Sequence, residues 1–289
     1  PMQRICHALT TRFPNLKITG LCHEVKSMDR QLPTLLETPL ENIEFEAGGL
    51  NHFSILLKVN YKDTGKDAYP IIREKFNDYY STLVNDHEGF ISKPGAERGV
   101  FFELFNQYNY LPITTDSHIG EYLPWAYSVA DHDGILDFYE NYKRKCLNYY
   151  ENDSYDEYFN PKVKEPHERI VPIIENIVND TNALEHAVNI PNKGFIECLP
   201  SDIVVEVPAI INKSGIHGKK LENYPKSFGV LLNSQVGAIQ MTTQAILNHS
   251  KKDALFALLA DPVVHDAKAA SSLLDTMLFQ QNDYLGYIN

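Results

Sequence analysis

The amino-acid sequence predicts an α+β fold in which small antiparallel sheets are wrapped by long helices. Short apolar or alternating runs fall in two groups, near residues 43–59 and 183–211. Most of the remaining chain has apolar residues at helical spacing. The chain has 289 residues, of which 43% are hydrophobic, and this is enough to bury a substantial core.

The first sixty residues contain the clearest strand pair. In order, we expect a helix to about Phe13, a strand over 17–22, a helix over 24–36, and strands over 43–49 and 53–59. The paired glycines Gly48 and Gly49 are expected to let the backbone turn sharply between the last two strands. That turn would place Asn51 and His52 at the entrance of the second strand.

The rest of the chain is helical apart from one strand-rich region. Helices are expected over 67–84, 97–108, 133–150 and 168–178, with a polar loop over 114–122. Strands are expected over 187–190, 195–199 and 203–209, between Pro and Gly residues that interrupt regular structure. Three helices, over 231–248, 251–260 and 267–280, complete the chain.

The charge and cysteine content narrow the class of protein. The chain has 26 Lys and Arg residues and 38 Asp and Glu residues, which gives it a formal net charge of −12. This negative charge disfavours nucleic acid and anionic membranes as partners. The four cysteines have no CxxC spacing, and no apolar run could span a bilayer. These features predict a protein of the reducing cytoplasm.

Two residues at predicted strand boundaries are candidate metal ligands. Cys22 and His52 would offer a thiolate and an imidazole, which suit a borderline divalent transition metal. The structural alternative is a buried cysteine and a hydrogen-bonded loop histidine. His23 directly follows Cys22 and could act as an acid near neutral pH, or could equally be a surface or capping histidine.

The loop over 114–122 concentrates further reactive groups. Asp116, His118, Glu121 and Tyr122 provide two carboxylates, an imidazole and a phenol, which are the groups that acid–base work on a sugar requires. The alternative is a helix start, capped by Asp116 or Ser117. The sequence contains neither GxGxxG nor GxxxxGK[ST], so it has no recognisable nucleotide cradle.

Several stretches, in order, resemble family 4 glycoside hydrolases, the NAD- and metal-dependent family. Gly20–Val25 (GLCHEV) resembles the family's Cys-His motif, and Gly49–His52 (GLNH) its Asn-His motif. Asp116–Tyr122 (DSHIGEY) is similar to its Ser-x-His-x-x-Glu-Tyr stretch. Leu199–Ala209 (LPSDIVVEVPA) and Ala254–Val263 (ALFALLADPV) resemble a core strand and a C-terminal helix. The resemblance covers nearly the whole chain.

The resemblance implies a fold and a domain organisation. It implies an α+β domain like the C-terminal half of lactate and malate dehydrogenases. Residues 1–289 would form the catalytic, substrate- and metal-binding C-terminal domain. Pro1-Met2 fits the end of the family's N-terminal NAD-binding Rossmann domain, which would then be absent from this chain. The activity of the isolated chain is therefore left open, and a non-catalytic fragment that keeps only the fold and the metal is one alternative.

The resemblance also implies a mechanism that differs from two-carboxylate hydrolysis. NAD takes a hydride from C3 of the sugar, a base removes the C2 proton, the aglycone is eliminated, and water adds at C1 before the hydride returns. Mn²⁺ or another divalent metal, held by Cys22 and His52, would bind two sugar oxygens.

The resemblance assigns the remaining roles as follows. Asp116 is the first choice for the base and Tyr122 the second, while His23 would assist the leaving group. Three residues would bind sugar hydroxyls, namely Asn51, His118 and Glu121.

The substrate and assembly are also implied by the resemblance. The Cys-His-Glu-Val version of the motif (Cys22–Val25) is similar to the α-galacturonidase branch, with α-glucosidase or α-galactosidase activity as the alternative. A hydroxy-acid dehydrogenase-like protein is a further alternative, although the Arg and His pair that it needs does not stand out. We expect a homodimer or a homotetramer.

Overall fold

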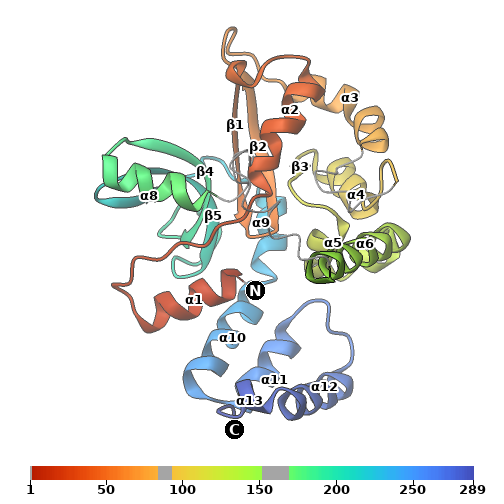
Figure 1. Cartoon of the computed structure of the whole chain (residues 1–289), viewed down its shortest axis with the longest axis vertical. Helices are drawn as coiled ribbons and strands as arrows, with labels where there is room; N and C mark the ends of the chain where they lie inside the picture. The colour runs from red at the N-terminus through yellow and green to blue at the C-terminus, as the bar shows by residue number, and fades with distance from the viewer. Residues whose placement is uncertain (1, 84–92, 152–168) are drawn as a thin grey trace.

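The computed structural model describes residues 2–83, 93–151 and 169–289 and is centred on one antiparallel sheet (Figure 1). The strand order is β3-β2-β1-β5-β4, with β6 paired to β5. The strands are β1 (Ile43–Leu50), β2 (Phe53–Tyr61), β3 (Leu111–Pro112), β4 (Ala183–Pro191), β5 (Val204–Asn212) and β6 (Gly215–Gly218). The α+β class is therefore confirmed. Within the described ranges, one six-stranded sheet replaces the several small sheets that the sequence predicted.

Helices precede, flank and follow the sheet. They are α1 (Met2–Arg12), α2 (Met28–Leu36), α3 (Tyr69–Thr82), α4 (Gly99–Tyr108), α5 (Asp116–Ile119), α6 (His132–Glu151), α8 (Ile170–Asn179), α9 (Lys226–Asn233), α10 (Val236–Asn248), α11 (Lys251–Ala260), α12 (Ala267–Gln280) and α13 (Asn282–Leu285). Single 3₁₀ turns lie at Val25–Ser27, Leu40–Asn42, Gly120–Tyr122 and Ala126–Ser128. In Figure 1, α10 runs away from the sheet toward α11–α13. No helix in the described ranges is long and apolar enough to cross a bilayer.

Both faces of the sheet are buried. Ile55 and Leu56 are neighbours in β2 and are fully buried, yet they belong to two different apolar clusters because successive strand side chains point to opposite faces. One cluster includes residues of α2 and α3, and the other includes residues of β5 and α9. This double burial explains why the first four residues of β2 are all buried, rather than every second one.

Two predicted strands are wrong. Residues 17–22 form no strand and make only an isolated bridge, in which Gly20 and Asn189 exchange backbone hydrogen bonds of 3.1 and 2.9 Å. Residues 195–199 form turns around Asn192, whose Nδ2 donates to the carbonyls of Ile196 and Leu199, both at 2.9 Å. Both segments are apolar because they pack, and pattern alone does not separate a packed turn from a strand.

The predicted turn is also placed differently. The chain reverses at Asn51 and His52, between the ends of β1 and β2, and His52 has a φ of 64°. Gly48 and Gly49 lie inside β1 and are needed there for close approach, not for turning. A Cβ on Gly48 would lie 2.8 Å from the Glu206 carbonyl oxygen, and one on Gly49 would lie 2.4 Å from that of Phe53.

Two helical predictions need correction. The polar segment 114–122 contains α5 and a 3₁₀ turn, so the helix-start alternative describes it better than a loop. The expected helix over 231–248 is divided into α9 and α10 at Ser234–Gln235. The other predicted helices agree with the structure to within a few residues.

Gly49→Ala is expected to destabilise the protein by about 2 kcal/mol or more, because its Cβ would overlap backbone atoms that cannot rotate away. Gly237→Ala is the matched control. Its Cβ would sit 3.5 Å from that of Ala260, an ordinary contact in α10, so alanine should be neutral or stabilising. Urea unfolding of both variants measures the difference. Equal stabilities would show that the β1 backbone does not need a glycine there.

Candidate functional site

The turn between β1 and β2 positions the first group of predicted residues. Asn51 and His52 form this turn, and the main-chain bridge at Gly20 places Cys22 beside it. The Asn51 side chain and the Glu24 backbone amide lie close to the Cys22 sulfur, and both act to lower the pKa of its thiol. Two segments that are distant in sequence, at residues 22–24 and 51–52, therefore meet here.

A buried carboxylate lies behind this turn. Glu206, in the middle of β5, is 1% exposed and accepts hydrogen bonds from Ser54 Oγ at 2.7 Å, Asn189 Nδ2 at 3.2 Å and Asn51 Nδ2 at 3.4 Å. Burial raises the pKa of Glu206, and these three hydrogen bonds oppose the rise. Burial, followed by the Glu206 charge, raises the pKa of the Cys22 thiol.

His52 packs against a second predicted residue. Its ring centroid lies 4.6 Å from that of His118, and the Ser117 hydroxyl lies 2.9 Å from His118 Nδ1. Ser117 in turn donates to Glu97 Oε2 at 3.1 Å. Burial, followed by the proximity of His118, lowers the pKa of His52 to about 3. The imidazole is therefore neutral at physiological pH, which is the form that binds a metal.

Tyr122 also belongs to this cluster. Its hydroxyl donates to the Asn51 carbonyl oxygen at 2.9 Å, and its ring stacks on Phe53 with centroids 5.0 Å apart. Burial raises the pKa of the phenol, and nearby carboxylates, among them Glu121 and Glu206, add to the rise. The predicted residues Cys22, Asn51, His52, His118 and Tyr122 are thus brought together.

Asp116 lies outside this cluster and contacts the backbone of two other segments. It is 2% exposed, and its two oxygens accept backbone amides of Phe101 at 3.1 Å and Asp131 at 2.9 Å. These bonds tie the start of α4 to the segment before α6. Both oxygens of Asp116 therefore hold the backbone, and its role as the base stays a prediction.

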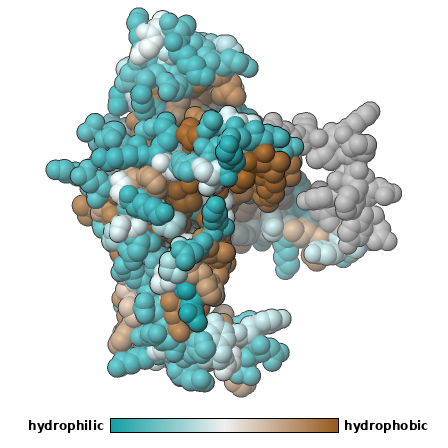
Figure 2. Space-filling view, turned by 90° about the vertical axis from the view of Figure 1, so that its left-hand side faces the viewer, coloured by the Kyte–Doolittle hydropathy of each residue, from teal (hydrophilic) through white to brown (hydrophobic). Residues whose placement is uncertain are grey.

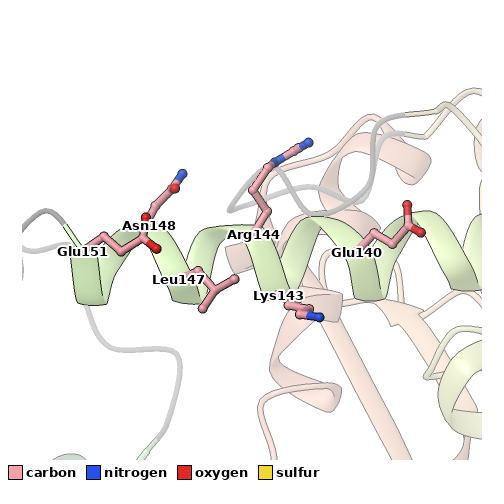
Figure 3. A pocket seen from close by; sticks show the side chains of 6 residues that line it. All are labelled: Glu140, Lys143, Arg144, Leu147, Asn148 and Glu151. Carbon is pink, nitrogen blue, oxygen red and sulfur yellow. The ribbon is translucent and has the colours of Figure 1, made fainter.

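The two remaining predicted residues are more exposed. His23 has 51% of its side chain exposed, and its Nε2 lies 3.5 Å from Glu24 Oε1. Glu121 is exposed and lines a pocket of about 460 Å³ between the 114–139 region and the α11–α12 connection. A second, shallower pocket of about 280 Å³ lies along α6 and contains none of the predicted residues (Figure 3).

The Cys22–His52 pair fits a metal only in part. A thiol and a neutral imidazole are suitable donors for a borderline divalent cation. Among the described residues, no group of three or more His, Cys, Asp or Glu side chains could hold an ion. Any metal bound by Cys22 and His52 therefore needs further ligands from substrate or water.

Sequence reasoning missed Glu206 as part of this cluster. The indication was available, since a single carboxylate interrupts the otherwise uncharged β5 segment VVEVPAIIN. A charged residue inside a buried strand needs hydrogen-bond partners and therefore marks a polar site. Its partners could not be identified from sequence, because they come from β2, β4 and the hairpin turn.

The comparisons with known proteins establish the family. Residues 47–264 match the model of the family 4 glycosyl hydrolase C-terminal domain. The chain is 40% identical over 314 residues to an α-glucosidase of Erwinia rhapontici, covering 100% of this chain and 67% of that protein. The chain therefore belongs to glycosyl hydrolase family 4.

Other relatives are named for activity on different sugars. An α-galacturonidase of Thermoanaerobacterium saccharolyticum is 28% identical over 99% of this chain and 65% of its own length. An α-galactosidase of Bacillus subtilis is 27% identical, and the match again covers 99% of this chain and 65% of that protein. The chain thus spans about two thirds of the length of these relatives.

Solved structures share the fold. The lplD protein of Bacillus subtilis has a TM-score of 0.78 at 25% identity, covering 96% of this chain and 67% of its own. A 6-phospho-α-glucosidase from gut microorganisms, solved with NAD and Mn²⁺, has a TM-score of 0.72 at 22% identity. The match covers 99% of this chain and 66% of that enzyme.

The low pKa of His52 predicts an acid-sensitive component of stability. Folding lowers this pKa from 6.5 to about 3, so the folded state binds fewer protons, and the stabilisation is complete above pH 6.5 and lost as pH falls toward 3. His52→Gln removes this component. Between pH 7 and 5, the unfolding free energy of the wild type should fall by about 2 kcal/mol more than that of the variant.

Urea unfolding of the metal-free proteins at several pH values provides the measurement. His217→Gln, at the one exposed position of strand β6, controls for the change of residue type. Parallel pH profiles for the wild type and His52→Gln would contradict the buried neutral imidazole.

Proposed function

We propose that this chain is the sugar- and metal-binding part of an NAD- and divalent-metal-dependent α-glycosidase that acts on a neutral α-glucoside. The observation that carries the proposal is the convergence of Cys22, Asn51, His52 and Tyr122 at one turn, in a member of family 4. NAD would be bound by a domain outside residues 1–289, because the sequence contains no nucleotide cradle.

The residues of this chain would divide the work as follows. Cys22 and His52 hold a divalent cation such as Mn²⁺, and Asn51 and His118 bind sugar hydroxyls. When bound, the cation would supply positive charge that favours the Cys22 thiolate and stabilises negative charge on sugar oxygens. His23 is exposed and next to Cys22, which suits contact with a departing aglycone. Glu121 would bind sugar from the neighbouring pocket.

Tyr122 replaces Asp116 as the proposed base. Its hydroxyl has a single protein acceptor, the Asn51 carbonyl oxygen, and it lies close enough to Cys22 for their charges to interact. It would take the proton from C2 of the sugar. Asp116 would instead hold the segment that carries His118 and Tyr122.

The local charge favours a neutral sugar over a uronate. The charges of Glu206, Glu24 and Glu121 act on Cys22 or Tyr122, and such a negative field disfavours a second anion. The higher identity to an α-glucosidase points the same way. An α-galacturonide is the second candidate, on the strength of the Cys22–Val25 motif and of α-galacturonidase relatives.

We further propose that the protein works in the cytoplasm as a homodimer or homotetramer. Four free cysteines suit a reducing compartment. Apolar side chains are exposed on α8, namely Ile170, Val171, Ile174 and Val178, and could pack against another subunit. Figure 2 views the molecule from the side on which α8 lies in Figure 1, and apolar residues form patches on this face.

The activity is tested on the full-length protein with p-nitrophenyl α-glucoside and α-galacturonide, with NAD, Mn²⁺ and reductant, omitting each addition in turn. We expect release that needs all three and that prefers the glucoside. Cys22→Ser should abolish metal-dependent release while leaving the circular dichroism spectrum and melting temperature unchanged. Wild-type rates in Cys22→Ser would refute the metal assignment, and release without NAD would refute the mechanism.

The choice of base predicts different outcomes for two conservative substitutions. Tyr122→Phe should lower kcat at least a hundredfold, as expected for loss of a proton-transferring group, with little change in stability. Asp116→Asn should retain activity but lose about 1–3 kcal/mol of stability, because an amide cannot accept both backbone donors with its one oxygen. Steady-state kinetics and urea unfolding of both variants provide the comparison. The reverse pattern would return the base role to Asp116.

A further inference from the structure

The Asn51 side-chain amide faces a carboxylate that acts as a hydrogen-bond acceptor. Its Nδ2 donates to Glu206 Oε1 at 3.4 Å, and its side chain lies beside the Cys22 sulfur. Ser54 and Asn189 also donate to Glu206, so the Asn51 amide faces it with its NH₂ group.

The other polar atom of the Asn51 side chain is its amide oxygen, Oδ1. Among the described residues, Asn51 Oδ1 accepts no hydrogen bond, and the residue as a whole is 4% exposed. A primary amide oxygen has two lone pairs and binds a hydroxyl donor well. Rotation of the amide by 180° would instead place this oxygen against the Glu206 carboxylate, which is repulsive.

Glu206 itself is held firmly. Ser54 Oγ donates to the other carboxylate oxygen at 2.7 Å, and Asn189 Nδ2 donates to Oε1 at 3.2 Å. These donors come from β2 and β4, on either side of β1 and β5 in the strand order. The carboxylate therefore cannot turn to follow a rotating amide.

We propose that Glu206 is a positioning residue that fixes the Asn51 amide, so that Asn51 presents Oδ1 to one sugar hydroxyl. The inference deepens the proposed function, on which it rests for the identity of the ligand. Glu206 does not touch the sugar. It acts by excluding the flipped amide, in which the NH₂ group would face the hydroxyl oxygen and the acceptor would be lost.

Glu206→Gln is the test, because it preserves size and removes the fixed polarity. Competitive inhibition of the full-length enzyme by glucose and by its 2-, 3-, 4- and 6-deoxy forms is measured for wild type and variant. The variant should bind glucose about tenfold more weakly, the loss of one hydrogen bond. One of the four deoxy sugars should bind both proteins equally, since it lacks the hydroxyl that Oδ1 accepts. Weakening that is uniform over all five sugars would overturn the proposal.

Ser54→Ala is the matched control. It removes the hydrogen bond to Oε2 but keeps that of Asn189 to Oε1, the oxygen that faces Asn51, so the inhibition pattern should stay that of the wild type. A pattern in Ser54→Ala equal to that of Glu206→Gln would overturn the proposal, because any disturbance of the buried network would then suffice.

A second measurement does not depend on the substrate. In protein labelled with ¹⁵N-asparagine, the Asn51 side-chain amide protons should show nuclear Overhauser contacts to the Cys22 β-protons in the wild type and in Ser54→Ala. These contacts should weaken or disappear in Glu206→Gln. Retained contacts in Glu206→Gln would overturn the positioning role. Fixed amide protons in a wild type that binds no glucose would instead count against the α-glucoside function alone.

Discussion

The close approach of β1 to its two neighbouring strands is the constraint on which the site depends. Side chains at positions 48 and 49 would overlap backbone atoms of β5 and β2, so only glycine allows the three strands to meet there. The register pairs Gly49 with Glu206, and the hairpin turn follows two residues later. The buried carboxylate and the turn that carries Asn51 and His52 are thereby brought into contact.

The polar cluster behind the turn is costly for the fold. Replacement of a buried carboxylate by an apolar side chain is frequently neutral or stabilising elsewhere in proteins, because desolvation opposes the hydrogen bonds gained. Here three donors are directed at Glu206, one of them from the turn itself. A hydrogen-bonded network of this kind orients its members more strictly than apolar packing does. The network therefore orients the side chains of the site, while burying its polar groups lowers the stability of the fold.

Local pattern predicted most of the elements and the residue types of the site, but not its three-dimensional grouping. The hairpin of β1 and β2 and the helices could be read from periodicity, since each is decided by neighbours in sequence. Residues 195–199 were misread because Asn192 satisfies their carbonyls, a contact that leaves no periodic trace. The backbone contacts of Asp116 could not be predicted for a similar reason. Its two backbone donors belong to α4 and to the segment before α6, which sequence spacing does not bring together.

The proposed pair of protein ligands, Cys22 and His52, would explain why substrate and metal bind together. An ion held only by Cys22 and His52 keeps several coordination positions open, as catalytic metal sites do. Two adjacent sugar oxygens could fill such positions, and the cation would then offset the charge of Glu206 and of the Cys22 thiolate. The fixed amide of Asn51 would add one directional contact beside the ion. Metal and amide together would select the sugar's orientation, so that the C2 proton faces Tyr122 rather than the structurally engaged Asp116.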